Sequence, residues 1–158
     1  MNKFNTADLC DEYKLSVADP IFKSFGANTH CHGRIKTVEA IEDNSYVKKL
    51  LQTNGGGCVM VIDGKGSNRC ALVGDNLAAM AIENNWSGII VNGCIRDSIE
   101  ISKIPISIKA LNLVPNKSEK KDIGKYGLDL SFAGITFREN EYIYSDPDGI
   151  VIAEKNLL

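Results

Sequence analysis

Two short runs, separated by a glycine-bearing loop and a helix-forming segment, constrain the fold of this chain more than any other feature. The runs cover residues 58–63 and 88–93, and the first is almost wholly apolar. Such runs predict strands that are covered on both faces of a sheet. Residues 77–82 predict a helix between them, with Asp75 or Asn76 at its start. Strand, helix and strand together form a βαβ unit, in which the strands are parallel and the crossover is right-handed.

The rest of the chain adds elements on both sides of this unit. Helices are expected over residues 6–13, capped by Asn5 or Thr6, and over residues 44–52. Strands are expected over residues 33–41, 106–111, 128–137, 141–144 and 149–153. Residues 146–149 read Asp-Pro-Asp-Gly, a turn signal that would pair the last two strands. A length of 158 residues fits one domain, so we predict a single-domain α/β fold over residues 1–158.

Composition and charge exclude several classes of function. A net charge of −2 gives no basic footprint for nucleic acid and no polybasic segment for an anionic membrane. No apolar run approaches the roughly 20 residues that a membrane-spanning helix needs. Residues 1–5 have no apolar core after Lys3, which argues against a secretory signal. We therefore expect a cytoplasmic protein that binds neither nucleic acid directly nor a membrane.

The five cysteines point in the same direction. Their number is odd and no CxxC spacing occurs. Cys58 and Cys94 lie beside apolar stretches and are interpreted as small buried hydrophobic side chains. A reducing compartment, with no disulfide framework, is the simpler interpretation.

Polar side chains gather where ligands bind in open α/β sheets, outside the carboxyl ends of the parallel strands. Here those ends are residues 63–66 and residues 92–97, and the crossover helix begins at residues 74–77. The free N–H groups of that helix and the positive end of its dipole favour an anion. We expect these three loops to face one place, bringing together a guanidinium, two carboxylates and a helix N-terminus.

This set of groups suits a 2-oxo acid, which has a carboxylate beside a carbonyl group. The helix N-terminus can bind the carboxylate, and Arg96 can donate hydrogen bonds to the carbonyl oxygen. Asp97 can hold Mg²⁺ or Mn²⁺, which prefer oxygen ligands and keep several waters. Asp75 can orient a metal-bound water. The metal and Arg96 would then stabilise the enolate that forms when a C–C bond breaks.

Purely structural alternatives stand beside this hypothesis. Asp75 can serve only as a helix cap, Arg96 and Asp97 can be a solvated pair, and the glycines can serve only turns. Residues 116–122 are interpreted as a solvated surface loop. These alternatives stay open on the residues alone.

Other motifs carry weaker signals. His30 and His32 would share one face of a strand and could bind a transition metal, but no third ligand is evident nearby. The glycines of residues 55–57 and 64–66 match neither the P-loop nor the dinucleotide-binding spacing. Trp86 is expected to be buried between the sheet and a helix rather than to serve as a ligand platform.

The sequence resembles the class II aldolase/RraA-like family, which includes the regulator of ribonuclease activity A and the 4-hydroxy-4-methyl-2-oxoglutarate aldolases. Three ordered motifs carry the resemblance: Asp63-Gly64-Lys65-Gly66, then residues 71–81 with Gly74-Asp75-Asn76-Leu77, then residues 88–97 ending in Arg96-Asp97. Further matching segments run along nearly the whole chain, at residues 6–11, 132–135 and 144–151.

The resemblance implies a fold, an assembly and a reaction. The fold would be an α/β/α sandwich of the swivelling β/β/α type, assembled as a homotrimer. The aldolase members cleave 4-hydroxy-4-methyl-2-oxoglutarate into two pyruvates and decarboxylate oxaloacetate through the pyruvate enolate, with a divalent cation. By motif, Gly74, Asp75, Asn76 and Leu77 would bind substrate together with Arg96. Asp97 would bind the metal, and Arg96 and Asp75 would be the catalytic residues.

A second branch of the family consists of regulators that bind ribonuclease E or RNA helicases without catalysing a reaction. Members of that branch can lack the aspartates that correspond to Asp75 and Asp97, and this sequence has both. The chain resembles the regulators in length, however, and no residue clearly matches the carboxylate that a C-terminal extension adds in longer aldolases. The resemblance alone therefore keeps a non-enzymatic regulator as the alternative to a metal-dependent lyase.

Overall fold

The predicted βαβ unit is the centre of the fold. The computed structural model describes residues 4–158, so that residues 1–3, which bear on the secretory-signal expectation, lie outside the described residues. Strands β4 (Val59–Asp63) and β6 (Gly88–Ile95) pair in parallel, and α3 (Asp75–Glu83) lies between them in the chain. The α/β fold class and the central unit are confirmed.

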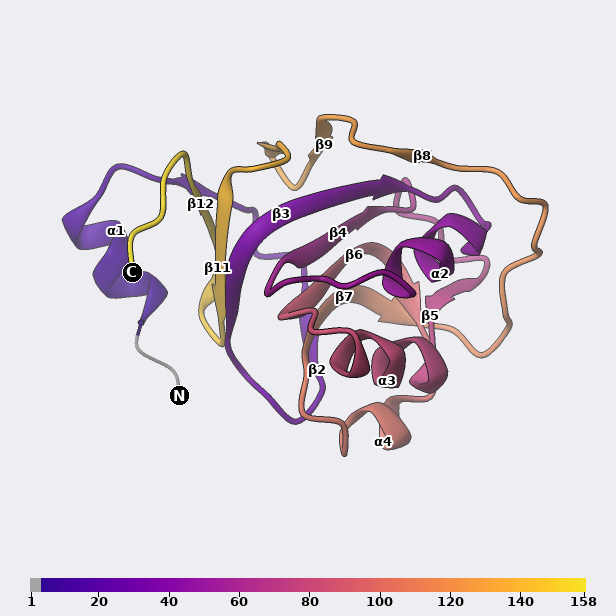
Figure 1. The fold of residues 1–158 in the computed structure, drawn as a ribbon. Coiled ribbons are helices and arrows are strands. Elements are labelled where there is room, and N and C mark those ends of the chain that lie inside the picture. Colours follow the sequence, from indigo (N-terminus) through magenta and orange to yellow (C-terminus); the bar gives the residue numbers. More distant parts are fainter. Residues whose placement is uncertain (1–3) are drawn as a thin grey trace.

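The other elements complete one large sheet, a small hairpin and three further helices. In chain order they are α1 (Thr6–Glu12), β1 (Ser16–Val17), β2 (Lys23–Phe25), β3 (Cys31–Glu39), α2 (Ser45–Leu51), β5 (Ala71–Val73), α4 (Ser98–Ile101), β7 (Ser107–Leu113), β8 (Lys125–Tyr126), β9 (Leu130–Phe132), β10 (Ile135–Phe137), β11 (Tyr142–Asp146) and β12 (Gly149–Ala153). The main path of the sheet is β1-β12-β11-β3-β4-β6-β7-β2, with β5 paired to β6 and β8 to β3. Helices α2, α3 and α4 lie on one side of the curved sheet (Figure 1).

Strand β4 shows why both faces of the sheet are covered. Its side chains alternate: Met60 and Ile62 face the cluster under the helices, whereas Val59 and Val61 face a second cluster. The second cluster contains Phe137 of the β9–β10 hairpin. The layers are therefore helices, parallel strands and a further β layer, and an all-buried strand needs cover of this kind.

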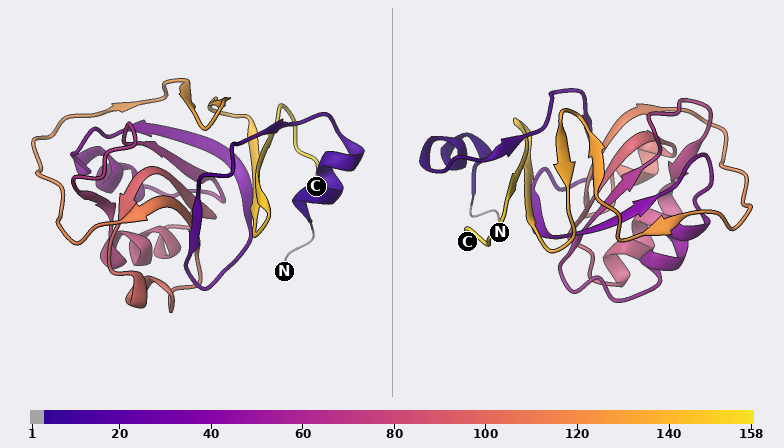
Figure 2. Two further views of the ribbon diagram at one scale, coloured as in Figure 1. Left: turned by 180° about the vertical axis from the view of Figure 1, so that it is seen from behind. Right: turned by 90° about the horizontal axis from the view of Figure 1, so that it is seen from above.

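The C-terminal hairpin was also predicted correctly. Strands β11 and β12 pair in the antiparallel sense around the turn that starts at Asp146. Helix α1 packs against both strands, and its N-cap Asn5 accepts hydrogen bonds from the N–H groups of Ala7 and Asp8. As a result α1 and the C-terminus lie on the same side of the molecule, beyond β11 and β12 (Figure 2).

Several elements differ from the sequence-based expectations. The loop between β4 and α3 contains β5, a short buried strand beside the end of β6. The single strand expected over residues 128–137 is instead the hairpin β9–β10, whose turn holds Ala133 and Gly134 at positive φ. Helix α4 was not predicted, because four residues are too few to show a helical period.

Two smaller expectations can be compared with the structure. Trp86 is 4% exposed in the cluster beneath the helices, and its indole N–H donates to the carbonyl of Thr53. Its predicted burial is confirmed. No helix among residues 4–158 is long and apolar enough to cross a membrane.

Candidate functional site

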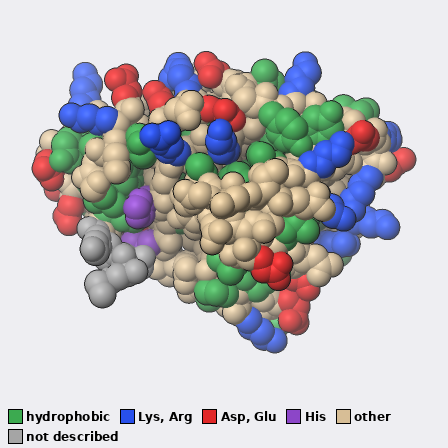
Figure 3. All heavy atoms as spheres, in the orientation of Figure 1, with side chains coloured by type: hydrophobic (Ala, Val, Ile, Leu, Met, Phe, Trp, Pro, Cys, Tyr) green, Lys and Arg blue, Asp and Glu red, His purple; other side chains and the backbone are tan. Residues whose placement is uncertain are grey.

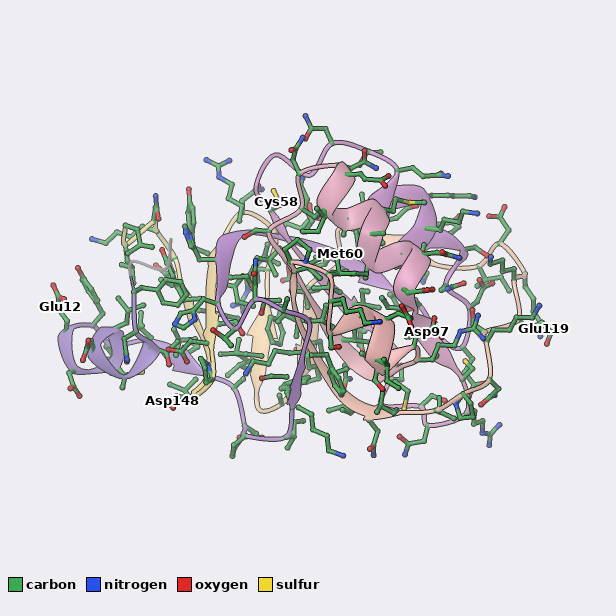
Figure 4. All side chains as sticks on the ribbon, turned by 90° about the horizontal axis from the view of Figure 1, so that it is seen from below. Glu12, Cys58, Met60, Asp97, Glu119 and Asp148 are labelled. Atoms are coloured by element: carbon green, nitrogen blue, oxygen red, sulfur yellow. The ribbon has the colours of Figure 1, made fainter. Side chains whose placement is uncertain are left out.

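A cleft of about 200 Å³ opens at the carboxyl edge of the sheet, between the start of α3 and the segment that follows β6. All six residues singled out from the sequence line it: Gly74, Asp75, Asn76, Leu77, Arg96 and Asp97. Figure 4 shows Asp97 at one end of α3. Residues 74–77, which begin α3, and the pair Arg96–Asp97 therefore line the same cleft. The roles given to these residues remain predictions.

Asp97 joins the two loops directly. One of its carboxylate oxygens, Oδ2, accepts a hydrogen bond of 3.0 Å from the N–H of Asp75. Asp97 has φ +62°, a left-handed conformation that aspartate tolerates better than most residues, and this turns its side chain back toward α3. A Cβ on Gly74 would lie 2.6 Å from the same oxygen, so only glycine leaves room for the carboxylate.

Arg96 is held by its backbone and leaves its guanidinium facing the cleft. Its N–H donates to the carbonyl of Val73 on β5, and its Nη1 lies 3.4 Å from the carbonyl oxygen of Pro115. The distance from Nε to Asp97 Oδ2 is 4.0 Å, and the side chain is 38% exposed. This loose ion pair leaves most of the five guanidinium donors available to a ligand.

The start of α3 is less open than the sequence suggested, which corrects one expectation. The N–H of Asp75 is already taken by Asp97, and the N–H of Asn76 donates to Oδ1 of Asp75 at 2.8 Å. The N-cap is Gly74, so Asp75 is the first helical residue and not the cap. Among residues 4–158, the N–H of Leu77 finds no acceptor, and it is the donor left for a bound anion.

The loop at residues 63–66 does not line the cleft, contrary to expectation. Asp63 is 1% exposed and is saturated by its neighbours: its Oδ1 accepts from the N–H of Lys65 and from Nδ2 of Asn92, each at 2.9 Å. The ammonium of Lys65 lies 3.1 Å from its Oδ2. This loop closes the end of β4, and the carboxylate of Asp63 is used within the fold.

Four polar residues of the cleft were missed by sequence reasoning: Asn44, Lys48, Lys117 and Lys120. Asn44 is the N-cap residue of α2 as expected, but its side chain accepts no hydrogen bond from the first turn of that helix. Its Nδ2 donates instead to the carbonyl of Leu72. The two later lysines belong to the polar stretch 116–122, which is mostly exposed but is not a free loop. Nothing in the local pattern reveals such long-range attachments.

Asp43 and Asn44 anchor that stretch. Asp43 accepts from the N–H groups of Lys121 and Ile123, and Ser118, which is 4% exposed, donates to Oδ1 of Asn44 at 2.7 Å. Burial raises the pKa of Asp43, but hydrogen bonds from Ser45 and these backbone groups outweigh it and hold the pKa below the ordinary value. The backbone of the segment that brings Lys117 and Lys120 to the cleft is therefore held in place.

The remaining sequence motifs lie elsewhere. His30 and His32 contact the ring of Phe4, and His32 also stacks on Tyr144. Nowhere in residues 4–158 do three His, Cys, Asp or Glu side chains gather as a protein-saturated metal site requires. All five cysteines are free thiols; Cys94 is buried as predicted, whereas Cys58 is only partly buried.

The fold and the site together define an α/β protein with a small, polar cleft between the start of the crossover helix α3 and the segment after β6. Comparison with known proteins places it further. The sequence pattern described as "RraA-like: Aldolase/RraA" matches residues 6–152, and the chain belongs to this family.

Close relatives cover nearly the whole chain. A protein of Alkalilimnicola ehrlichii, named "Putative 4-hydroxy-4-methyl-2-oxoglutarate aldolase", is 48% identical over 155 residues, which are 97% of this chain and 96% of that protein. A protein of the same name from Bacillus cereus is 47% identical over 156 residues, 98% of each chain.

Two solved structures share the fold closely but bear other names. One, named an S-adenosylmethionine: 2-dimethylmenaquinone methyltransferase, comes from Geobacillus kaustophilus HTA426 and has a TM-score of 0.95 at 44% identity, covering 98% of this chain and 97% of its own. The other is named the RNA-processing inhibitor RraA from Thermus thermophilis; its TM-score is also 0.95, at 35% identity, with 99% and 96% covered. Because these names differ while the fold does not, function has to be argued from the site.

Proposed function

We propose that this chain is a divalent-metal-dependent lyase that cleaves 4-hydroxy-4-methyl-2-oxoglutarate into two pyruvates and also decarboxylates oxaloacetate. The observation that carries the proposal is the contact between Asp97 and the start of α3, with Arg96 beside it in one cleft. The aldolase names of the close relatives support the same class of reaction. The simultaneous presence of Asp75 and Asp97 favours an enzyme over a regulator.

The carboxylates of the cleft fit a hard cation such as Mg²⁺ or Mn²⁺. Asp97 uses Oδ2 for the N–H of Asp75, while its Oδ1 accepts no hydrogen bond within residues 4–158. Mg²⁺ is commonly bound by one or two carboxylates and completes its coordination with water and substrate. When bound, the cation would supply Lewis-acid stabilisation of negative charge on the substrate oxygens. We assign Asp97 as its ligand, with Asp75 placed to orient a bound water.

The residues of the cleft account for the rest of the chemistry. The N–H of Leu77 and the positive end of α3 bind the C1 carboxylate of the 2-oxo acid. Arg96 donates to the C2 oxygen, on which negative charge grows as the C3–C4 bond breaks and its electron pair passes into the enolate. In the aldol cleavage the 4-hydroxyl loses its proton and the departing half becomes the second pyruvate, whereas in the decarboxylation of oxaloacetate the departing carboxylate becomes CO₂. A proton taken up at C3 then gives pyruvate. Because Arg96 binds the developing charge, it contributes more to the transition state than to the ground state.

The test is the release of pyruvate from oxaloacetate by the purified protein. We expect turnover with Mg²⁺ or Mn²⁺, loss of turnover with a chelator, and recovery when the metal is returned. Asp97→Ala should show no metal-dependent turnover while its circular dichroism spectrum matches that of the unmodified protein. Turnover that survives both the chelator and Asp97→Ala would count against this mechanism.

A non-enzymatic regulator of RNA processing is the second candidate, favoured by the solved structure named RraA, which covers 99% of this chain. Binding of such a partner would need only a surface, so that a regulatory role could also exist beside catalysis in the cleft. Pull-down of a ribonuclease E fragment or an RNA helicase by the purified chain tests it, and absence of binding to both counts against it. We also propose a homotrimer as the assembly, which sedimentation analysis can check.

A further inference from the structure

The cleft carries a surplus of positive charge that a 2-oxo acid with a single carboxylate does not need. Four cationic side chains and two carboxylates line it, whereas the whole chain has a net charge of −2. Three of the cations are lysines, Lys48, Lys117 and Lys120, which we call the lysine rim. Figure 3 shows Lys and Arg side chains gathering on this side of the molecule, near α2.

The lysine rim differs from the other lysines around it because its charges have no internal partner. Among residues 4–158, no carboxylate lies within 4.0 Å of its ammonium groups. The neighbours outside the cleft are paired: Lys49 contacts Asp122, and Lys121 lies 3.6 Å from Glu119. Unpaired cations in a concave site raise the local concentration of anions and attract those with more charge most strongly.

The rim is also held in position, as a specificity element should be. Lys117 forms a β-bridge with Ala71, and the next residue, Ser118, is anchored to Asn44 by a buried hydrogen bond. Lys48 lies on α2, one turn into the helix that Asn44 begins. Two separate segments, each with its backbone held in place, thus present cations to the same cleft.

We propose that the lysine rim binds a second carboxylate of the substrate and so selects 2-oxo dicarboxylates over 2-oxo monocarboxylates. This inference rests on the proposed function, because it takes Arg96 and Leu77 as the site of the C1 carboxylate and the C2 carbonyl. It gives the rim a role in turnover as well. The dicarboxylate substrate contacts the rim, whereas pyruvate has one carboxylate and leaves without that contact.

The experiment compares two uncleaved probes, 2-oxoglutarate with two carboxylates and 2-oxobutyrate with one. Their affinities are measured by calorimetry with Mg²⁺ present, for the unmodified protein, Lys48→Gln and the double variant Lys117→Gln/Lys120→Gln. Matched controls are Lys121→Gln, on the same segment, and Lys49→Gln, beside Lys48. Each control removes the same charge at a lysine that does not line the cleft.

We expect the double variant to bind 2-oxoglutarate about tenfold or more weakly, the loss typical of a hydrogen bond to a charged group. Lys48→Gln should show a smaller loss in the same direction. Affinity for 2-oxobutyrate should change less than twofold, and both controls should behave as the unmodified protein. An equal loss for the two probes, no loss for either, or the same loss in Lys121→Gln would overturn the proposal.

The outcome is separable from that of the lyase proposal. If oxaloacetate is not turned over but 2-oxoglutarate is bound through the rim, the reaction is wrong and the dicarboxylate site stands. If oxaloacetate is turned over and the rim variants keep its KM, the lyase stands and the rim is not a specificity element. If the unmodified protein binds neither probe, the rim proposal is overturned.

Discussion

Asp63 is the last residue of β4, Asp97 lies two residues after the neighbouring parallel strand β6, and the structure uses the two aspartates in opposite ways. Asp63 is 1% exposed, and both of its carboxylate oxygens are engaged by Lys65 and Asn92. The Asp97 side chain is 34% exposed and accepts one hydrogen bond, from Asp75. A carboxylate whose acceptor sites are filled from within holds the fold together, whereas one with acceptor sites to spare can bind a ligand.

The residues beside each aspartate repeat the contrast. After Asp63 comes Gly64, whose missing side chain lets Leu72 and Asn92 approach the backbone. Near Asp97, Gly74 makes room for the carboxylate itself. Lys65 forms ion pairs with Asp63 and Glu39, whereas Arg96 makes only a 4.0 Å contact with Asp97. Glycine, cation and aspartate therefore serve packing at one site and the cleft at the other.

The largest expected effects come from removing each carboxylate in turn. Asp97→Asn, which keeps a side chain that tolerates the left-handed backbone at φ +62°, should reduce metal-dependent decarboxylation to background and change the free energy of unfolding by less than about 1 kcal/mol. Asp63→Ala leaves Nδ2 of the buried Asn92 and the backbone N–H of Lys65 without their acceptor, and should cost about 3 kcal/mol of stability. Activity assays and urea unfolding of both variants measure whether one variant loses activity alone and the other loses stability alone. The contrast fails if Asp63→Ala is inactive although it is folded and stable.

The cations give the next largest effect. Arg96→Ala should lower kcat for oxaloacetate by about 10²–10³-fold, because the guanidinium stabilises charge that develops in the transition state. Arg96→Lys keeps the charge but not the planar guanidinium, and its kcat should lie between those of the unmodified protein and Arg96→Ala. Lys65→Met, the matched change at the other site, should leave kcat unaltered. An effect of Arg96→Ala confined to KM would contradict the role given to the guanidinium.

The glycines give a smaller effect that tests geometry alone. A Cβ at Gly74 would meet Asp97 Oδ2 at 2.6 Å, so Gly74→Ala should displace the carboxylate and lower activity about tenfold, with little loss of stability. A Cβ at Gly64 would meet Leu72 Cδ1 at 2.5 Å, and Gly64→Ala should cost about 1–3 kcal/mol through overpacking. Thermal melts should show the larger loss for Gly64→Ala, and kcat/KM should show the larger loss for Gly74→Ala. At Gly149 a Cβ meets no atom within 4 Å, which makes Gly149→Ala a neutral control.

The sequence was informative where a local pattern determines structure. The βαβ unit follows from two apolar runs and the helix between them, and the β11–β12 hairpin follows from its turn residues. The same reasoning brought Gly74 and Arg96 to one edge, because parallel strands end together. Those elements were predictable since each depends on residues close in the chain.

The parts that were missed depend on contacts between distant residues. Lys117 and Lys120 look like part of a solvated loop, and attachments to distant residues, such as that of Ser118 to Asn44, 74 residues away, place them at the cleft. Likewise no local signal shows that Asp97 occupies the N–H of Asp75, or that Asn92 saturates Asp63. Hydrogen bonds of this kind leave no periodicity in the sequence.

Asp146 gives the smallest effect and extends the comparison to a third aspartate, one that resembles Asp63. It is 2% exposed and accepts hydrogen bonds from Thr6, Asp148 and Gly149. Burial raises its pKa, but those hydrogen bonds outweigh burial and hold the pKa below the ordinary value. A carboxyl group whose pKa is lower in the folded state stabilises the protein above its unfolded pKa of about 4, and loses that contribution as the pH falls through the folded value.

Asp146→Asn should therefore lower Tm at pH 7, and the difference in Tm between the two proteins should shrink as the pH falls below about 4 and through the lowered folded-state pKa of Asp146. Melting curves of both proteins across this range measure the convergence. A difference in Tm between the two proteins that stays constant with pH would show that the charge of Asp146 does not contribute to folding. The carboxylate oxygens of Asp146, like those of Asp63, accept hydrogen bonds within the fold. Asp146→Asn should therefore keep its kcat at neutral pH, in contrast to a change at Asp97.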